Sequence, residues 1–223
     1  MNNPKNNRIL SALPETEYQR LAAHLEPVQL SFDRVLQEAR QRCETIYFPT
    51  KGIVSLVSVM ENQSTTEIGL IGREGVVGIL QLLGEGICHS LSIVQVKGTA
   101  MQIDAEVLRV ELERSRVLQK LMFRYALKLF NQVSQGAACN NHHSVKQRTA
   151  RWLLMLDERS DETLSMTQQL LSKMLGVRRT GISEVANEIK RQGIIDYQRG
   201  KITILDRKAL EAVACECYQL IRE

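Results

Sequence analysis

The hydrophobic pattern of the chain changes its period near Asp104, and this change limits the folds that are open to it. Between residues 28 and 103, short runs rich in β-branched residues alternate with turn residues, and eight glycines recur among them. Several short strands at this spacing are typical of an antiparallel sandwich or barrel. After Asp104 the apolar residues recur at helical spacing instead. The sequence therefore predicts an α+β fold, with a jelly-roll-like β-roll at the N-terminal end and helices after it.

The composition indicates a globular protein. The chain has 223 residues, of which 43% are hydrophobic and 24% charged, enough for two domains with cores of their own. The longest apolar runs, residues 53–60 and 76–83, are far too short to span a bilayer. The first ten residues, MNNPKNNRIL, lack the apolar centre of a signal peptide. We expect a cytoplasmic protein with no membrane partner.

A long helix is predicted next, running roughly from Arg116 to Ala138, where neither Pro nor Gly interrupts the pattern before Gly136. At 1.5 Å per residue it would be about 35 Å long. Its apolar band is wider than one packing partner needs, so we expect one side to cover the chain's own β-domain and another to meet a second subunit. The alternative is a helix packed entirely within one subunit. The residues expected to form the dimer helix are Leu118, Leu121, Met122, Tyr125 and Leu129.

The segment from 167 to 205 has the pattern of a helix-turn-helix followed by a hairpin. A short helix over 167–175 precedes Gly176, and the stretch LGVRRTGISEVANEIKRQG then places apolar residues on one helical face. Those residues are Ile182, Val185, Ala186 and Ile189. Two alternating runs follow, joined by Arg199-Gly200, which is typical of a β-hairpin.

The same segment holds most of the chain's excess positive charge. Residues 167–208 contain nine Lys or Arg and four Asp or Glu, a net charge of +5 against +4 for the whole chain. Arg178 and Arg179 stand where the second helix begins, although the helix dipole disfavours cations there by some tenths of a kcal/mol. A polyanion that meets this helix end would more than offset that cost. We therefore expect double-stranded DNA as a partner.

The cysteines and the histidines each allow two interpretations. Five cysteines, scattered and odd in number, do not indicate a disulfide framework. Cys215 and Cys217 could serve a metal or redox role, but two small residues on a C-terminal helix are the simpler interpretation. His142 and His143, with Cys139 nearby, could bind a metal, but a hinge between domains is the simpler interpretation. We expected no metal and no cofactor.

The chain resembles the CRP/FNR superfamily of bacterial transcription regulators over essentially its whole length. The most specific part is HSVKQRTARWLLMLDER together with LSMTQQLLSKMLGVRRTGISEVANEIKRQGIIDYQRGKITILDRKALEAVACECY. The N-terminal match is to a cyclic-nucleotide-binding-type β-roll, mainly through Gly72-Arg-Glu-Gly-Val-Val-Gly78. The resemblance implies a sensor-like β-roll over 1–115, a dimerisation helix and hinge over 116–143, and a winged helix-turn-helix domain over 144–223.

The resemblance also implies roles for single residues. It implies a homodimer on a two-fold-symmetric operator, with RNA polymerase and a small-molecule effector as further partners to test. The residues in the family's base-contacting positions are Arg179, Thr180, Ser183 and Glu184. The residues implied to contact the DNA backbone are Thr167, Gln168, Arg178, Arg199 and Lys201.

The chain departs from the family at the cyclic nucleotide. Members that bind cyclic AMP carry a Gly-Glu pair for the ribose and an Arg-Ser or Arg-Thr pair for the phosphate. The corresponding candidate effector pocket here contains Gly78-Ile79 and His89-Ser90. An isoleucine cannot accept the ribose hydrogen bond. With His89 in place of the arginine, a charge-assisted bidentate contact to the phosphate is also lost, at a cost of about 1.5–3 kcal/mol or more. We therefore predict that the protein does not bind cyclic AMP by the usual contacts.

Four functions compete at this stage. The first is a homodimeric, sequence-specific transcription regulator whose effector is unknown. The second is a protein-interaction module that uses its winged domain without DNA, and the third is a small-molecule or haem sensor of the same family, with His24 or His89 as haem ligand. The fourth is an enzyme, which we do not expect, since the sequence shows no nucleophile–base spacing and no phosphate-binding GxxxxGK[ST] loop.

Overall fold

The computed structural model describes residues 3–84, 86–160 and 164–222. The described chain divides into two compact units. The first consists of Met1–Leu56 and Leu70–Phe130, and the second of Val57–Gly69 and Asn131–Glu223. None of the described helices is both long enough and apolar enough to cross a membrane.

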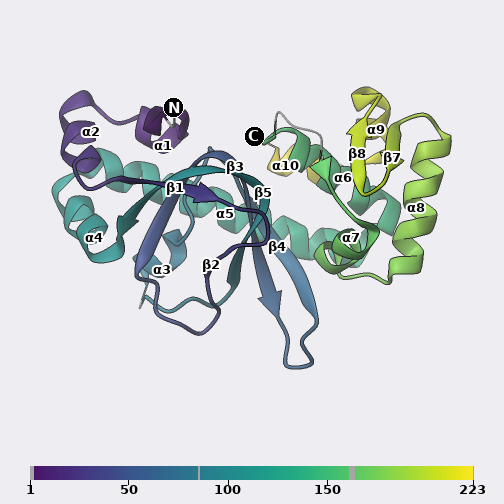
Figure 1. The fold of residues 1–223 in the computed structure, drawn as a ribbon, viewed down its shortest axis with the longest axis horizontal. Coiled ribbons are helices and arrows are strands. Elements are labelled where there is room, and N and C mark those ends of the chain that lie inside the picture. The colour runs from purple at the N-terminus through teal and green to yellow at the C-terminus, as the bar shows by residue number, and fades with distance from the viewer. Residues whose placement is uncertain (1–2, 85, 161–163, 223) are drawn as a thin grey trace. The chain divides into compact units, whose positions relative to one another are not determined.

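The first unit is built around a β-sheet (Figure 1). The strands of this sheet are β1 (Glu26–Leu30), β2 (Val35–Gln37), β3 (Thr45–Val59), β4 (Thr65–Ile71) and β5 (Leu91–Asp104). The end of β3 from Val57 on and β4 up to Gly69 belong to the second unit. They follow the order β1-β5-β3-β4, with β2 also paired to β5, and β5 runs antiparallel to both β1 and β2. The long strand β3 is buried along most of its length, as expected for a strand of Ile, Val and Phe residues.

Short helices accompany this sheet. They are the 3-10 turn η1 (Pro4–Asn6), α1 (Arg8–Ser11), α2 (Glu15–Ala22), α3 (Ile79–Leu83) and α4 (Ala105–Arg114). The change of period at Asp104 is confirmed, because the Asp104 carboxylate accepts hydrogen bonds from the backbone N–H groups of Glu106 and Val107 and so caps α4. Strand β5 therefore ends at Asp104, where α4 begins.

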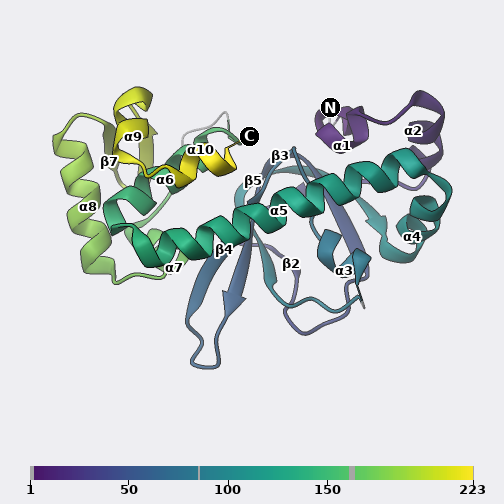
Figure 2. The same ribbon diagram turned by 180° about the vertical axis from the view of Figure 1, so that it is seen from behind.

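Helix α5 (Arg116–His142) is unbroken and runs on from the first unit into the second (Figure 2). The Ser115 hydroxyl accepts a hydrogen bond from the Leu118 N–H at its start. The sequence predicted its end near Ala138, and the structure carries it four residues further, through the polar stretch Asn140–His142. Polar residues are compatible with a helix wherever their side chains remain exposed, and Asn140, Asn141 and His142 are exposed.

The second unit is mostly helical. Its elements are α6 (Val145–Asp157), β6 (Leu164–Ser165), α7 (Gln168–Leu175), α8 (Arg179–Arg191), β7 (Ile195–Gln198), β8 (Lys201–Ile204), α9 (Arg207–Val213) and α10 (Cys217–Ile221). Ser144 and Gln147 form a capping box at the start of α6. Helix α6 is central to the unit, with every residue from Arg148 to Leu156 buried. The predicted α+β class, with a β-rich first half and a helix-turn-helix near the end, is confirmed.

Candidate nucleic-acid interface

The turn between α7 and α8 depends on one glycine. Gly176 ends α7 with φ +63°, in the left-handed region that residues with a Cβ rarely adopt. The Val177 N–H then donates to the Ser172 carbonyl at 3.0 Å, the six-residue bond of a Schellman motif. At the other end, the Thr167 hydroxyl caps α7 by accepting from the Leu170 N–H at 3.1 Å. The predicted helix-turn-helix is therefore present, with both ends of its first helix capped.

Helix α8 has one buried and one exposed face. Ile182, Ala186 and Ile189 are buried and Val185 is half-buried, as the 3–4 spacing predicted. Of the four residues expected to contact bases, Arg179, Thr180 and Glu184 are exposed. Ser183 is half-buried, and its hydroxyl donates to the Gln168 side-chain oxygen at 2.8 Å. Gln168 thus fixes Ser183 in place as well as standing at the start of α7.

The N-terminal end of α8 is strongly electropositive. Arg178 is the N-cap residue and provides no side-chain cap, and the first turn carries no acidic residue. The first backbone N–H groups of a helix have no partner within the helix, and the dipole concentrates positive charge there. Arg178, Arg179 and Thr180 are all exposed. Two guanidinium groups therefore reinforce a helix end that already favours anions.

The wing lies beside the start of α7. Strands β7 and β8 pair antiparallel around Arg199 (φ +50°) and Gly200 (φ +75°), the two positive φ angles of a type I′ turn. A third strand, β6, pairs with β8 and places Ser165 opposite Lys201. The Met166 N–H also donates to the Gly200 carbonyl at 2.5 Å. These bonds bring Thr167, Arg199 and Lys201, three of the expected backbone contacts, to one place.

The cations of this surface differ in whether they have acidic partners. Lys190 Nζ lies 3.0 Å from Asp196 Oδ1, and its hydrogen bond lowers the pKa of that carboxyl below its usual value. Lys146 pairs with Glu188 at 2.7 Å. Among the described residues, by contrast, no acidic side chain pairs with the exposed residues Arg178, Arg179, Arg199 and Lys201. The unpaired positive charge is therefore concentrated at the start of α8 and on the wing.

The residues of the candidate effector pocket lie in the first unit, where side chains of the chain itself pack closely around Gly78. Gly78 (φ +96°) begins α3, and a Cβ there would lie 2.6 Å from the Gln37 amide nitrogen. Ile79 is 1% exposed. His89 is exposed and Ser90 is buried. Gly78, Ile79 and Ser90 are thus buried, and His89 alone among these four is exposed.

Gln37 and the cysteines near it form a closed polar cluster beside Gly78. The Gln37 amide nitrogen donates to the Cys43 sulfur at 2.9 Å and to the Thr45 carbonyl at 3.0 Å. Its oxygen accepts from the Ser92 hydroxyl at 3.1 Å. Burial raises the pKa of Cys43 to about 12, with Cys88 adding to the shift, so the thiol stays neutral. Sequence reasoning missed this cluster because Ser92, which is 55 residues from Gln37 in the sequence, joins it only after folding.

Helix α5 carries two apolar stripes. Leu118, Met122, Tyr125 and Leu129 are buried by the chain itself, Leu121 is half-buried, and the Tyr125 ring lies over Gly75, where no side chain intervenes. Four of the five dimer helix residues named from the sequence therefore face inward. A different stripe is exposed: Phe123 is 51% exposed, Leu127 60% and Phe130 63%. Hydrophobic periodicity alone did not show which stripe the chain covers.

Comparison with known proteins identifies this architecture. Residues 147–213 match the family model of the Crp-like helix-turn-helix domain. No curated protein sequence is a significant match to the chain. Solved structures are much closer in fold than in sequence, so they establish the fold alone.

Three of these structures cover most of the chain. FixK2 from Bradyrhizobium japonicum aligns with a TM-score of 0.73 at 14% identity, over 86% of this chain and 98% of its own. A transcriptional regulator of the crp/fnr family from Eubacterium rectale aligns with a TM-score of 0.73 at 19% identity, over 94% and 98%. The global regulator CLP from Xanthomonas campestris, described as responsive to c-di-GMP, aligns at 0.70 and 16%, over 86% and 99%.

These features define a winged helix-turn-helix protein joined to a β-roll. The domain match shows a Crp-like helix-turn-helix domain over residues 147–213, and the solved structures show that most of the chain shares the fold of regulators that include a crp/fnr-family protein.

Proposed function

We propose that this protein is a sequence-specific DNA-binding transcription regulator that acts as a homodimer and reads the major groove with α8. The observation that carries the proposal is the exposed start of α8, where Arg178 and Arg179 join an uncapped helix end without an acidic partner among the described residues. A helix-turn-helix places the N-terminal residues of its second helix against base edges. In that position, cations that have no acidic partner among the described residues are available to bind DNA.

The roles of the residues follow from their exposure and chemistry. The Arg179 guanidinium has the fork geometry that matches guanine O6 and N7, so it is assigned to base recognition together with Thr180 and Glu184. Ser183, tied to Gln168, contributes through its hydroxyl oxygen. Thr167, Arg178, Arg199 and Lys201 are assigned to phosphates, which fix the domain on the duplex without reading sequence.

The exposed stripe of α5 supports a dimer. Phe123, Leu127 and Phe130 are spaced four and three residues apart, the spacing of a coiled-coil seam, and Ser134 and Ala137 continue it with small residues. The seam proposed here thus replaces the residues named from the sequence. A second copy of the same helix is the natural partner, because packing two identical stripes together forms a closed, self-complementary interface. Two recognition helices would then meet half-sites one helical turn apart.

We propose that an effector, if the protein has one, is not cyclic AMP bound by the usual contacts. Ile79 stands where the family's ribose-binding carboxylate would be and is buried, and His89 stands where the phosphate-binding arginine would be. If a ligand exists, it must bind one of two conformations better than the other to change DNA affinity. The packing of Tyr125 over Gly75 offers a direct link from the glycine-rich loop to α5.

The test is selection of bound duplexes from a random pool by the full-length protein, with and without cell extract. The proposal expects a two-fold-symmetric site whose affinity falls steeply with salt, because each neutralised phosphate contributes about −0.9 to the slope of log K against log salt. Enrichment of no sequence, or binding that does not respond to salt, would contradict it and favour a protein partner for the winged domain. Including the extract reveals whether a small molecule is required.

A further inference from the structure

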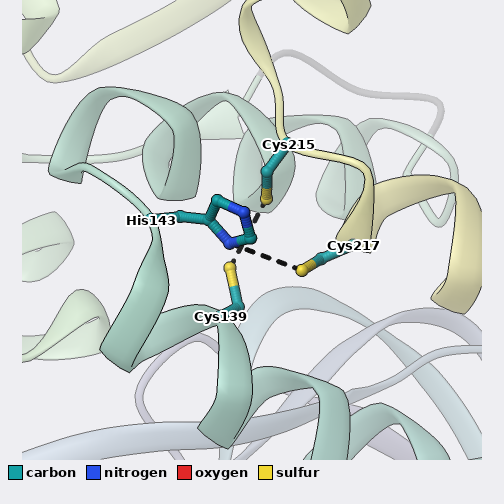
Figure 3. Close-up of side chains that lie close together, drawn as sticks. All are labelled: Cys139, His143, Cys215 and Cys217. Carbon is teal, nitrogen blue, oxygen red and sulfur yellow. Dashed lines mark hydrogen bonds between the residues drawn. The ribbon is translucent and has the colours of Figure 1, made fainter.

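Four metal-binding side chains converge in the second unit (Figure 3). Cys139 lies in the last turns of α5, and His143 follows one turn later. Cys215 and Cys217 come from the segment where α9 ends and α10 begins. The three sulfurs and one imidazole nitrogen all lie within 4.8 Å of one another. Three ligands of this set are buried, and the fourth, His143, is half-buried.

We propose that Cys139, His143, Cys215 and Cys217 form a structural zinc site. The Cys139 and Cys215 sulfurs are 3.5 Å apart, and the Cys217 sulfur lies 3.6 Å from His143 Nδ1. A tetrahedral Zn²⁺ with Zn–S of about 2.3 Å and Zn–N of about 2.1 Å separates its ligands by roughly 3.5–3.8 Å. These two separations already match edges of a Cys₃His tetrahedron, and all four ligand atoms lie within 4.8 Å of one another. Binding would release the three thiol protons to solvent and leave the imidazole neutral.

The residues around the four ligands suit a metal as well. His143 Nε2, the nitrogen not facing the sulfurs, lies 3.2 Å from the Glu216 carboxylate. A ligating histidine commonly donates its second N–H to such a carboxylate, which fixes the ring and its tautomer. The Gln135 amide donates to the Cys217 sulfur at 3.1 Å, and the Cys217 backbone N–H favours the Cys215 thiolate. Each of these bonds orients a donor atom or stabilises a thiolate.

The charge of the proposed site is also balanced by its surroundings. Zn²⁺ with three thiolates and a neutral imidazole carries a net charge of −1. Arg151 is buried, and although burial raises the pKa of Cys139 to about 12, the positive charge of Arg151 opposes that shift. A buried guanidinium is costly unless an anion accompanies it. The metal-bound thiolates would supply that anion, which a set of neutral thiols would not.

Two other interpretations of the cluster explain less. Three buried cysteines can act as small apolar residues, but that role gives no reason for an imidazole and a carboxylate at the same place. An iron–sulfur cluster places its thiolates on different iron atoms, which separates the sulfurs further than one ion does. A single tetrahedral ion suits four ligand atoms that lie within 4.8 Å of one another.

The proposed ion would join segments that are more than 70 residues apart in the sequence. His143 immediately precedes Ser144, the N-cap of α6, and Cys217 begins α10. The ion would therefore anchor the C-terminal segment to the point where α5 passes into the helix-turn-helix domain. A structural Zn²⁺ site contributes its binding free energy to folding. This inference does not depend on DNA binding.

The first experiment measures metal in the full-length protein. Protein purified without chelator, or reconstituted anaerobically with ZnSO₄ after reduction, should contain one zinc per chain by elemental mass spectrometry. The Cys215→Ser and Cys217→Ser variants should each lose most of that zinc. Cys88→Ser is the matched control, because Cys88 is equally buried but belongs to the first unit, and it should retain the full amount.

The second experiment remains decisive if the serine variants do not fold. Co²⁺ added to the reduced wild-type protein should give the visible ligand-field bands of a tetrahedral ion and the charge-transfer bands of thiolate ligands. His143→Cys should keep a tetrahedral site, with a spectrum shifted toward four thiolates. Glu216→Gln, which removes no ligand, should weaken metal affinity by about 10–100-fold in competition with a chelator.

Three outcomes would overturn the proposal. The first is a reduced wild-type protein that takes up neither Zn²⁺ nor Co²⁺, or takes up Co²⁺ with a spectrum unchanged in the Cys217→Ser variant. The second is stoichiometric iron with acid-labile sulfide, which would indicate a cluster. The third is a Cys139–Cys215 disulfide, found by peptide mapping in protein trapped at lysis, which would make these two cysteines a covalent link.

Discussion

The two regions that the family uses to bind other molecules differ here in how their polar groups are satisfied. Beside Gly78, the Gln37 amide bonds to Cys43, Thr45 and Ser92, so its donors and acceptor are used within the chain. At the start of α8 and on the wing, exposed cations have no acidic partner among the described residues. A buried amide whose groups are paired internally has little to offer a ligand, whereas unpaired surface charge favours a partner of opposite charge. The difference supports DNA as the main partner and argues against cyclic AMP.

The largest expected effect concerns assembly of the dimer. If the effector pocket of the N-terminal half is closed, dimerisation is the role that this half retains. Leu127→Glu combined with Phe130→Glu should produce a monomer, because two like charges would replace the exposed apolar stripe of α5. Affinity for the two-half-site operator should then fall by about 10²–10⁴-fold, the usual contribution of a linked second site. Sedimentation velocity and fluorescence anisotropy measure the two effects.

The control for this prediction is Lys128→Glu, a charge change on the same helix outside the Phe123–Leu127–Phe130 stripe, which should leave the dimer intact. A dimer that persists in the double variant would remove this stripe as the seam.

Arg179→Ala should have the next largest effect. Removing a bidentate contact to one base should cost about 1–3 kcal/mol on the selected operator and should relax the preference at one position per half-site. Competition between the selected duplex and single-base variants of it measures both quantities. A loss of affinity equal on every sequence would show that Arg179 contacts phosphate only.

Lys201→Ala should have a smaller and more uniform effect. Because a phosphate contact carries no sequence information, the variant should weaken all duplexes about equally and reduce the salt slope by about 1. Anisotropy titrations at several salt concentrations, on the selected and a scrambled duplex, provide the test. Loss of specificity without a change in slope would reverse the roles of Lys201 and Arg179.

The smallest expected effect is that of cyclic AMP, which should change nothing. A ligand that binds only the folded state raises the melting temperature as its concentration increases. With the Gly78 region closed, a large excess of cyclic AMP should shift neither the melting temperature nor the affinity for DNA. A dose-dependent shift would show that the closed cluster opens, and would make Gln37→Ala the next variant to examine.

The sequence predicted the parts of the fold that depend on local pattern. The apolar set Ile182, Val185, Ala186 and Ile189 located α8, and Arg199-Gly200 located the turn of the wing. Both could be predicted because helical spacing and turn conformation are determined by neighbouring residues. The change of period at Asp104 likewise marked the end of the long strands.

The features that the sequence did not predict depend on distant parts of the chain. Periodicity revealed a broad apolar band on α5 but not that Leu118 and Leu129 would be covered while Leu127 and Phe130 stayed exposed. The grouping of Cys139 and His143 with Cys215 and Cys217 depends on how α9 and α10 return toward α5. Neither could follow from the spacing of neighbouring residues, because both depend on which segments meet after folding.

The most direct test of the account is the salt dependence of binding to the selected duplex, measured for the wild-type protein and Arg179→Ala side by side. On the selected duplex, the account predicts that log K falls steeply with log salt for both proteins, along nearly parallel lines. The two lines should be separated by a difference in binding free energy of about 1–3 kcal/mol, and the difference should be much smaller on a scrambled duplex. Wild-type binding that is flat with salt, or two lines that coincide on the selected duplex, would contradict the claim that the start of α8 reads DNA.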